Sequence, residues 1–279
     1  MPEEKPFERA GRIIRDEIRT KATPQQVWDA WTDPNKITQW FVDKASGAPE
    51  VGKTFTWEFE KFGVKIPYEV AAADPAKYFV LRWTPPPGYP PGLLEIFIER
   101  EGGETILRLV NSGFREGAEW DAEYQGTVSG WRLTLAILKY YLENYFGRPK
   151  TTILQMRPAT YSVDAILPWF REPSLLVKWL TSSGGISNPG EQCELALRDG
   201  GRVTGRVLAV SKSEAVTSWE DFGGTLELKA FPMGPQKMVG LRGTSWDITP
   251  ALIAGVEKQM GAAIDRLVGA LGTAAASAK

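Results

Sequence analysis

The sequence predicts an α+β protein made of two tandem domains that share one design. Three observations support this: two stretches of the chain repeat each other, alternating apolar residues indicate strands, and each half ends in a long amphipathic helix. With 279 residues, the chain is long enough for two domains that each bury a hydrophobic core. We expect each domain to contain a strand, a short helix, a meander of strands and a long helix.

An internal repeat relates the two halves of the chain. Residues 23–40 (TPQQVWDAWTDPNKITQW) align without a gap with residues 162–179 (SVDAILPWFREPSLLVKW), and both stretches end on a Trp. A second pair of similar stretches follows in the same order, and these end at Trp83 and Trp219. Two matches in the same order indicate a tandem duplication.

The second copy is trimmed relative to the first, because the stretch from Trp219 to Trp246 is much shorter than its counterpart from Trp83 to Trp131. The extra residues of the first copy are expected in two loops, 84–92 (TPPPGYPPG) and 111–121 (NSGFREGAEWD). The first of these is most simply a stiff surface loop. Alternatively, it is a lid with Tyr89 at its tip, or a polyproline surface for a partner.

The first elements have clear boundaries in the sequence. Residues 12–20 have the composition of a strand. Thr23, Pro24 and Gln26 predict the start of a helix, with Thr23 as the N-cap of a capping box and Pro24 at the first helical position. The Asp-Pro pair at 33–34 predicts the end of that helix.

A meander of strands follows, and a long helix closes each domain. Phe55, Trp57 and Phe59 alternate and therefore share one strand face. A helix is expected over 127–146, followed by a linker at 147–150, so the predicted domains are 1–150 and 151–279. The apolar stripe of the first long helix is predicted to be Trp131, Leu135, Leu138 and Leu142. In the second long helix, capped by Thr249, the predicted stripe is Leu252, Val256, Met260, Ile264 and Leu267.

Composition excludes several classes of function. Lys plus Arg number 33 and Asp plus Glu 34, a balance that argues against nucleic-acid binding. The chain has no His and a single Cys, Cys193, which excludes Cys/His zinc sites, His-dependent nucleophiles and an intrachain disulfide. No stretch is long and apolar enough to span a membrane, and the charged start is unlike a secretory signal. We therefore expect a cytoplasmic protein with no metal and no cofactor.

The residue pattern of the first half resembles the SRPBCC superfamily, which includes START and birch-pollen-allergen proteins. It is most similar to the branch named for the activator of the ninety-kilodalton heat-shock chaperone ATPase. The resemblance covers residues 12–146 well and 158–271 weakly. It rests on Val27, Trp28, Trp31, Asp33, Pro34, Trp40, Gly52, Trp83, Gly130 and Trp131. It implies a helix-grip fold, in which a curved antiparallel sheet wraps around the long helix and a cavity opens between them.

The candidate site is that cavity in the first domain. Aromatic residues and one Leu on the sheet and the long helix are expected to line it: Trp40, Phe55, Trp57, Phe59, Tyr68, Trp83, Phe97, Trp131 and Leu135. Tyr68 is the best candidate for a hydroxyl inside it, whereas Glu58 and Arg82 alternate with apolar residues and are expected to face solvent. No residue is assigned a catalytic role, and Cys193 is expected to be an ordinary strand residue.

Three hypotheses about function remain. The first is a binding protein for an apolar or amphipathic small molecule or lipid, held beneath the loop at 84–92. The second, implied by the resemblance, is a protein that binds a heat-shock chaperone ATPase through its surface. The third is a cyclase-like enzyme, which would need an ionisable group in the cavity. Binding without catalysis is favoured because the sequence contains no pair of acidic residues at a spacing typical of acid–base chemistry.

Overall fold

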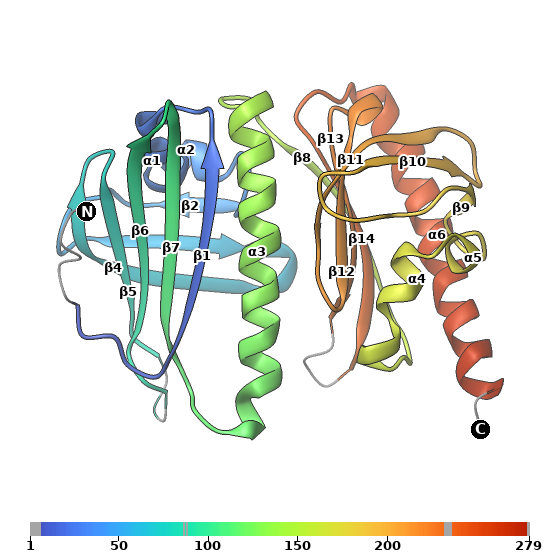
Figure 1. The fold of residues 1–279 in the computed structure, drawn as a ribbon, viewed down its shortest axis with the longest axis horizontal. Coiled ribbons are helices and arrows are strands. Elements are labelled where there is room, and N and C mark those ends of the chain that lie inside the picture. Colours follow the sequence, from blue (N-terminus) through green and yellow to red (C-terminus); the bar gives the residue numbers. More distant parts are fainter. Residues whose placement is uncertain (1–6, 86, 88, 232–235, 278–279) are drawn as a thin grey trace. The chain divides into compact units, whose positions relative to one another are not determined.

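The structure, a computed structural model, describes residues 7–85, 87, 89–231 and 236–277. It divides into two compact units, Met1–Gly147 and Arg148–Lys279 (Figure 1). Each unit contains one seven-stranded antiparallel sheet among the described residues, together with helices. The predicted α+β class with two tandem helix-grip domains is therefore confirmed.

The sheet of the first domain is a continuous meander, with one strand moved to the edge. Its order is β1-β7-β6-β5-β4-β3-β2, so that the first strand pairs with the last. All neighbours are antiparallel. The strands are β1 Arg12–Thr20, β2 Lys44–Ser46, β3 Thr54–Phe59, β4 Val64–Asp74, β5 Tyr78–Trp83, β6 Gly92–Glu101 and β7 Glu104–Phe114.

Three helices complete the first domain: α1 Pro24–Thr32, α2 Pro34–Ile37 and α3 Asp121–Asn144. The predicted capping box is present, because the side chain of Thr23 accepts from the amide of Gln26 and the Gln26 side chain accepts from the amide of Thr23. The helix ends where the Asp-Pro pair predicts. Asp33 then caps α2, since its carboxylate accepts from the amide of Asn35.

A Trp side chain caps the end of α1. The carbonyl of Ala30 would normally accept from the amide of residue 34, but Pro34 has no N–H to donate. The indole Nε1 of Trp40 donates to this carbonyl instead, at 2.8 Å, and both residues are buried. The aligned Asp-Pro or Glu-Pro pair and the later Trp of the repeat thus form one structural unit.

The second domain repeats this device. The carbonyl of Trp169 faces the same deficit because Pro173 lies four residues later, and the indole of Trp179 donates to it at 2.9 Å. The strand order β8-β14-β13-β12-β11-β10-β9 also matches that of the first domain position by position. Equivalent hydrogen bonds and equal strand orders are what a tandem duplication predicts.

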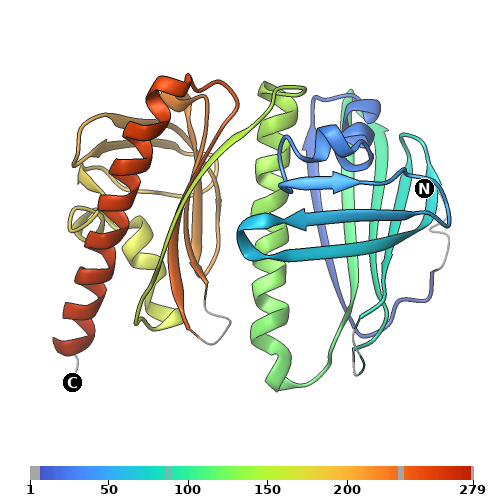
Figure 2. The same ribbon diagram turned by 180° about the vertical axis from the view of Figure 1, so that it is seen from behind.

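The final helix of the second domain is longer than that of the first, and four of its strands are shorter than their counterparts. Figure 2 shows both domains from behind. Its strands are β8 Thr151–Pro158, β9 Thr181–Ser183, β10 Gln192–Leu197, β11 Arg202–Val210, β12 Glu214–Trp219, β13 Gly224–Phe231 and β14 Met238–Ser245. Its helices are α4 Leu167–Arg171, α5 Pro173–Leu176 and α6 Pro250–Ser277.

The polar stretch 111–121, predicted as a loop, is only partly one. Its first four residues extend β7, which pairs with β1 as far as Phe114 opposite Arg12. Gly113 makes this possible: its φ of 98° suits glycine, and a Cβ there would lie 2.5 Å from the Cα of Gly92. The extra length of the first copy therefore lies partly in longer strands.

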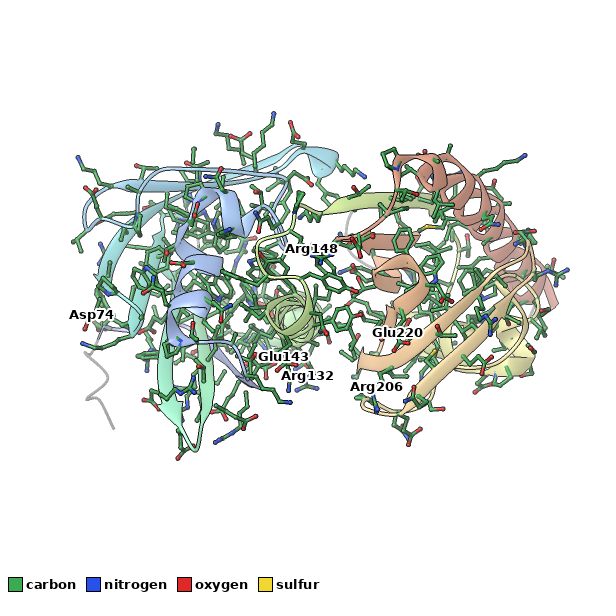
Figure 3. All side chains as sticks on the ribbon, turned by 90° about the horizontal axis from the view of Figure 1, so that it is seen from above. Asp74, Arg132, Glu143, Arg148, Arg206 and Glu220 are labelled. Atoms are coloured by element: carbon green, nitrogen blue, oxygen red, sulfur yellow. The ribbon has the colours of Figure 1, made fainter. Side chains whose placement is uncertain are left out.

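The long helix α3 starts earlier than the predicted 127 and ends two residues before 146. Acidic residues in its first turn, Asp121 and Glu123, favour that earlier start. Two polar contacts tie α3 to the edge of the sheet. Arg132 lies 4.0 Å from the carboxylate of Asp16 on β1, and Glu143 accepts from the amide of Lys21 (Figure 3).

The apolar stripes of both long helices face their sheets, with one correction. Leu135, Leu138 and Leu142 of α3 are buried, as predicted. In α6, Leu252 is 56% exposed, whereas Ile253 packs against the core. Ile253 lies seven residues before Met260, two helical turns, and so falls on the buried face, while Leu252 is rotated away by about 100°.

Candidate functional site

The first domain contains a cavity of about 190 Å³ between its sheet and the N-terminal half of α3. Strands β4 to β7, the 84–91 loop and α3 all contribute to its wall. The lining residues are Ile66, Tyr68, Trp83, Tyr89, Gly92, Leu93, Leu94, Asn111, Ser112, Gly113, Phe114, Glu123 and Trp131. The hollow is largely apolar, with a few polar groups.

Three of the nine predicted site residues line this cavity, namely Tyr68, Trp83 and Trp131. All three are half-buried, as expected for side chains that border an open space. Trp131 is held in place by its Nε1, which donates to Oδ1 of Asn111 at 2.9 Å. Asn111 in turn donates to the carbonyl of Leu93 at 2.9 Å, so the indole is fixed to the sheet.

Five other predicted residues lie in the packed interior beside the cavity and are not among its lining residues. They are Trp40, Phe55, Trp57 and Leu135, which are buried, and Phe59, which is half-buried and packs against Phe41 with ring centroids 5.5 Å apart. Trp57 packs edge-on against Tyr68 with ring centroids 4.8 Å apart, and Trp31 lies 6.2 Å from Trp131. Aromatic rings thus fill one end of the space beneath the sheet, and the cavity occupies what remains.

Phe97 lies on the opposite face of the sheet. Its neighbours Ile96 and Ile98 point into the core, so Phe97 points outward by the alternation of β6. It packs against Tyr78 at 4.7 Å, and its cross-strand partner Arg108 binds carboxylates at the surface. The sequence did contain a signal for this, because Phe97 alternates in register with Glu95 and Glu99, opposite to Leu94, Ile96 and Ile98.

Some polar atoms of the residues that line the cavity have no hydrogen-bond partner among the described residues. Burial raises the pKa of Tyr68 well above its usual value, so its phenol stays neutral. Ser112 is almost fully buried, and its Oγ has no hydrogen-bond partner within the described part of the chain. The carboxylate of Glu123, from the first turn of α3, also borders the cavity. The lining residues therefore include three with a hydroxyl, Tyr68, Tyr89 and Ser112, and one with a carboxylate.

A stacked cation lies next to Tyr89, one of the lining residues. The guanidinium of Arg115 lies 3.2 Å from the ring centroid of Tyr89 and 3.5 Å from that of Trp120. Tyr89 comes from the 84–91 loop and Trp120 from the 3₁₀ turn before α3, so Arg115 joins two segments distant in sequence. This arrangement was not predicted, because nothing in the sequence pairs residue 115 with residue 89.

The charged strand residues behave as predicted. Glu58 forms an ion pair with Lys65, and Arg82 forms one with Glu69 at 3.1 Å, at the surface of the sheet. In the second domain, Cys193 is buried in strand β10, and burial raises the pKa of its thiol to about 11. A thiol with a raised pKa is a weak nucleophile at neutral pH.

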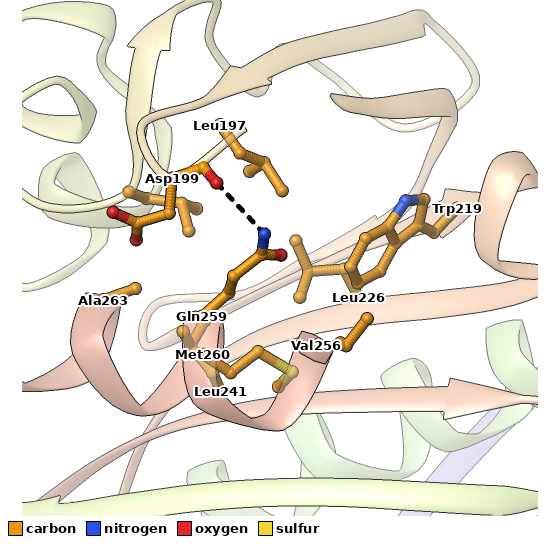
Figure 4. A pocket seen from close by; sticks show the side chains of 10 residues that line it. Leu197, Asp199, Trp219, Leu226, Leu241, Val256, Gln259, Met260 and Ala263 are labelled. Carbon is orange, nitrogen blue, oxygen red and sulfur yellow. Dashed lines mark hydrogen bonds between the residues drawn. The ribbon is translucent and has the colours of Figure 1, made fainter. Parts of the chain in front are cut away.

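The equivalent space in the second domain is filled. A hollow of about 20 Å³ remains there, between Trp219, Leu226 and α6 (Figure 4). Gln259 closes it by donating to the carbonyl of Asp199 at 3.1 Å, and Met260 fills its floor. Such a volume holds about one water molecule, so this hollow does not accommodate an organic ligand.

Other classes of site are not found in the described residues. No cluster of three or more Cys, Asp or Glu side chains there could hold a metal ion. Among the same residues, no helix combines the length and hydropathy needed to cross a membrane.

Known proteins resemble the chain in one or both halves. Residues 21–143 match the family model described as "Activator of Hsp90 ATPase homolog 1-like protein". Protein MLL2253 from Mesorhizobium loti is 26% identical over 47% of this chain and 96% of that chain, with a TM-score of 0.42. The Aha1 dimer from Colwellia psychrerythraea is 24% identical over 47% and 96%, with a TM-score of 0.41.

A structure with two domains is similar along nearly the whole chain. The di-domain ARO/CYC BexL from the BE-7585A biosynthetic pathway is 14% identical over 95% of this chain and 94% of that chain, with a TM-score of 0.45. No curated protein matches the chain.

The family match covers the elements that build the cavity. It begins directly after β1 and ends in the last turn of α3, and it includes the capped helix α1 with Trp40. The resemblance predicted from the sequence is thus confirmed over these elements. Residues 21–143, most of the first domain, thus match the family of activator of Hsp90 ATPase homolog 1-like proteins, the branch of the SRPBCC superfamily that the sequence pattern resembles.

Proposed function

We propose that the first domain binds a small, largely apolar molecule in its cavity. The observation that carries this proposal is the cavity of about 190 Å³ bordered by Tyr68, Trp83 and Trp131, in a domain whose interior is otherwise packed with aromatic rings. The second domain keeps the same strand order, but the hollow between its sheet and α6 has a volume of only about 20 Å³. This contrast supports a specific role for the open space in the first domain.

The volume of the cavity limits the size of the ligand. An engineered apolar cavity of about 150 Å³ in another protein binds benzene, whereas drug-sized ligands need about 300 Å³ or more. A cavity of about 190 Å³ therefore suits a single ring or a compact branched group. Long acyl chains and fused polycyclic molecules would have to displace the aromatic side chains around them.

A cavity-filling variant tests the proposal. Leu94 lines the cavity, so Leu94→Phe should place its extra ring in empty space and leave stability nearly unchanged. Leu81 is 1% exposed and does not line the cavity, so Leu81→Phe should cost about 1–3 kcal/mol through overpacking. This matched change checks that Leu94 borders a real hollow.

Ligand binding is then measured by NMR titration of the whole chain with toluene, phenol and tert-butanol. We expect chemical-shift changes at β6, β7 and α3 in the native chain and none in Leu94→Phe. If no probe shifts these signals at millimolar concentration, or if Leu94→Phe binds as well as the native chain, the cavity is not a binding site.

A second function is favoured by the family description, which names an activator of the Hsp90 ATPase. Such an activity would use the surface of the first domain and would not need the cavity. The test is the ATPase rate of an Hsp90-type chaperone with and without the chain. A stimulated rate that persists in Leu94→Phe would assign this activity to the surface, and an unchanged rate would exclude it.

A further inference from the structure

The wall of the cavity is rich in aromatic rings and carries a single kind of charge. Five of its lining residues are aromatic: Tyr68, Trp83, Tyr89, Phe114 and Trp131. Of the described residues that line it, Glu123 alone has an acidic side chain, and none has a basic one. Three of the rings come from the sheet, one from the 84–91 loop and one from α3, so aromatic side chains approach the hollow from several sides.

Aromatic faces and a carboxylate favour the same type of ligand. The quadrupole of an aromatic ring attracts a cation placed over its face, and cages of several rings bind quaternary ammonium groups in this way. A carboxylate beside such a cage adds a direct attraction between opposite charges. A neutral apolar ligand would gain from the rings but would leave Glu123 without a counter-charge.

Glu123 is available for this role. It is half-buried, and no ion pair involving its carboxylate is found in the described part of the chain. The neighbouring acid of the same turn, Asp121, is already paired with Arg12. A carboxylate in the first turn also stabilises the helix through its dipole, so the effect of Glu123 on stability alone does not reveal a binding role.

Arg115, the nearby cation, does not give the cavity a preference for anions. Arg115 is not among the lining residues, and its Nε is buried without a partner in the described residues. Its two faces are covered by Tyr89 and Trp120. The guanidinium therefore braces the ring of Tyr89 from behind, whereas Glu123 borders the hollow itself.

We propose that the ligand of the first-domain cavity carries a compact alkylammonium group, held among the five aromatic rings with Glu123 as its counter-charge. This inference rests on the proposed function and specifies the chemical class of the ligand. The branched trimethylammonium group is of the size that the cavity volume allows.

Three probes of nearly equal shape separate charge from size. Choline carries a trimethylammonium group, 3,3-dimethylbutan-1-ol is its neutral carbon analogue, and 3,3-dimethylbutanoate carries a negative charge. Their dissociation constants are measured by NMR titration of the whole chain. We expect choline to bind about tenfold more tightly than the alcohol, and the acid to bind most weakly.

The variant Glu123→Gln removes the charge and keeps the shape of the side chain. It should reduce the affinity for choline about tenfold and leave the affinity for 3,3-dimethylbutan-1-ol unchanged, which also shows that the cavity is intact. The control is Glu119→Gln, which removes a nearby exposed charge that does not line the cavity. Its affinities should match those of the native chain.

The outcomes distinguish this inference from the proposed function. If the alcohol binds as tightly as choline, or if Glu123→Gln leaves the preference intact, the inference is wrong and the apolar site remains. If the acid binds most tightly, the inference is wrong, because the cavity then prefers anions. If none of the three probes nor the neutral probes above binds, both proposals fail together.

Discussion

The indole of Trp40 supplies the hydrogen bond that Pro34 cannot. Replacing this indole should therefore destabilise the first domain by more than the loss of ring packing alone. In Trp40→Phe the carbonyl of Ala30 stays buried but loses its donor. Leaving such an acceptor unsatisfied costs about 1–3 kcal/mol. The smaller ring adds a packing loss, so the total effect should exceed the hydrogen-bond contribution alone.

Trp31→Phe is the matched control. Trp31 is fully buried and lies 5.1 Å from Trp40, but its Nε1 has no hydrogen-bond partner in the described part of the chain. The same change of ring size there removes no hydrogen bond and relieves an unsatisfied donor. Trp40→Phe should therefore lower the free energy of unfolding by about 1–3 kcal/mol more than Trp31→Phe does.

Urea denaturation of the whole chain, combined with hydrogen exchange at β1 and β7, measures the loss in the first domain. Trp179→Phe tests the same bond in the second domain, where exchange should rise at β8 and β14. If Trp31→Phe proves as destabilising as Trp40→Phe, the carbonyl cap is not the source of the stability, and the reasoning from Pro34 is refuted.

Three further predictions concern single side chains. Arg115→Met should lower the free energy of unfolding by about 1–2 kcal/mol in urea denaturation, because the guanidinium then no longer joins Tyr89 to Trp120; an unchanged free energy would contradict this. Because burial raises the pKa of Tyr68, its phenol ionises more readily in the unfolded chain, and stability falls as the pH rises above 10. Urea unfolding at pH 9 to 11 should show a shallower fall in Tyr68→Phe than in the native chain. Cys193, whose thiol pKa burial raises to about 11, should react with a thiol reagent at pH 8 at the rate of unfolding; rapid reaction of the native chain would show that the strand opens locally.

Local rules in the sequence predicted the elements that depend on neighbouring residues. The capping box at Thr23, the helix stop at Asp33 and the repeat itself follow from short-range chemistry, and the structure confirms them. The sequence showed that this Trp is repeated, but it did not show that the indole caps a carbonyl. The link between Trp40 and the missing amide of Pro34 becomes clear only when the chain after α1 is placed in space.

The candidate site was harder to predict because alternation identifies the two faces of a strand without saying which is hollow. Phe55 and Trp57 do point inward, but into the packed end of the interior. Phe97 shows the opposite problem, since an apolar residue on an outer face looks like a core residue in the sequence. Glu123 was overlooked because its helix starts before the predicted residue 127, so the prediction left it outside the helix.

The packed interior of the second domain has a consequence for calorimetry. A molecule that enters the first domain stabilises the native form of that domain, by about 2.7 kcal/mol when its free concentration is a hundred times Kd. The corresponding hollow of the second domain has room for about one water molecule, so the same solute gains nothing there. Where the two melting transitions are resolved, the melting temperature of the first domain should rise with ligand concentration while that of the second stays fixed. The duplicated copy thus serves as an internal control within the same chain.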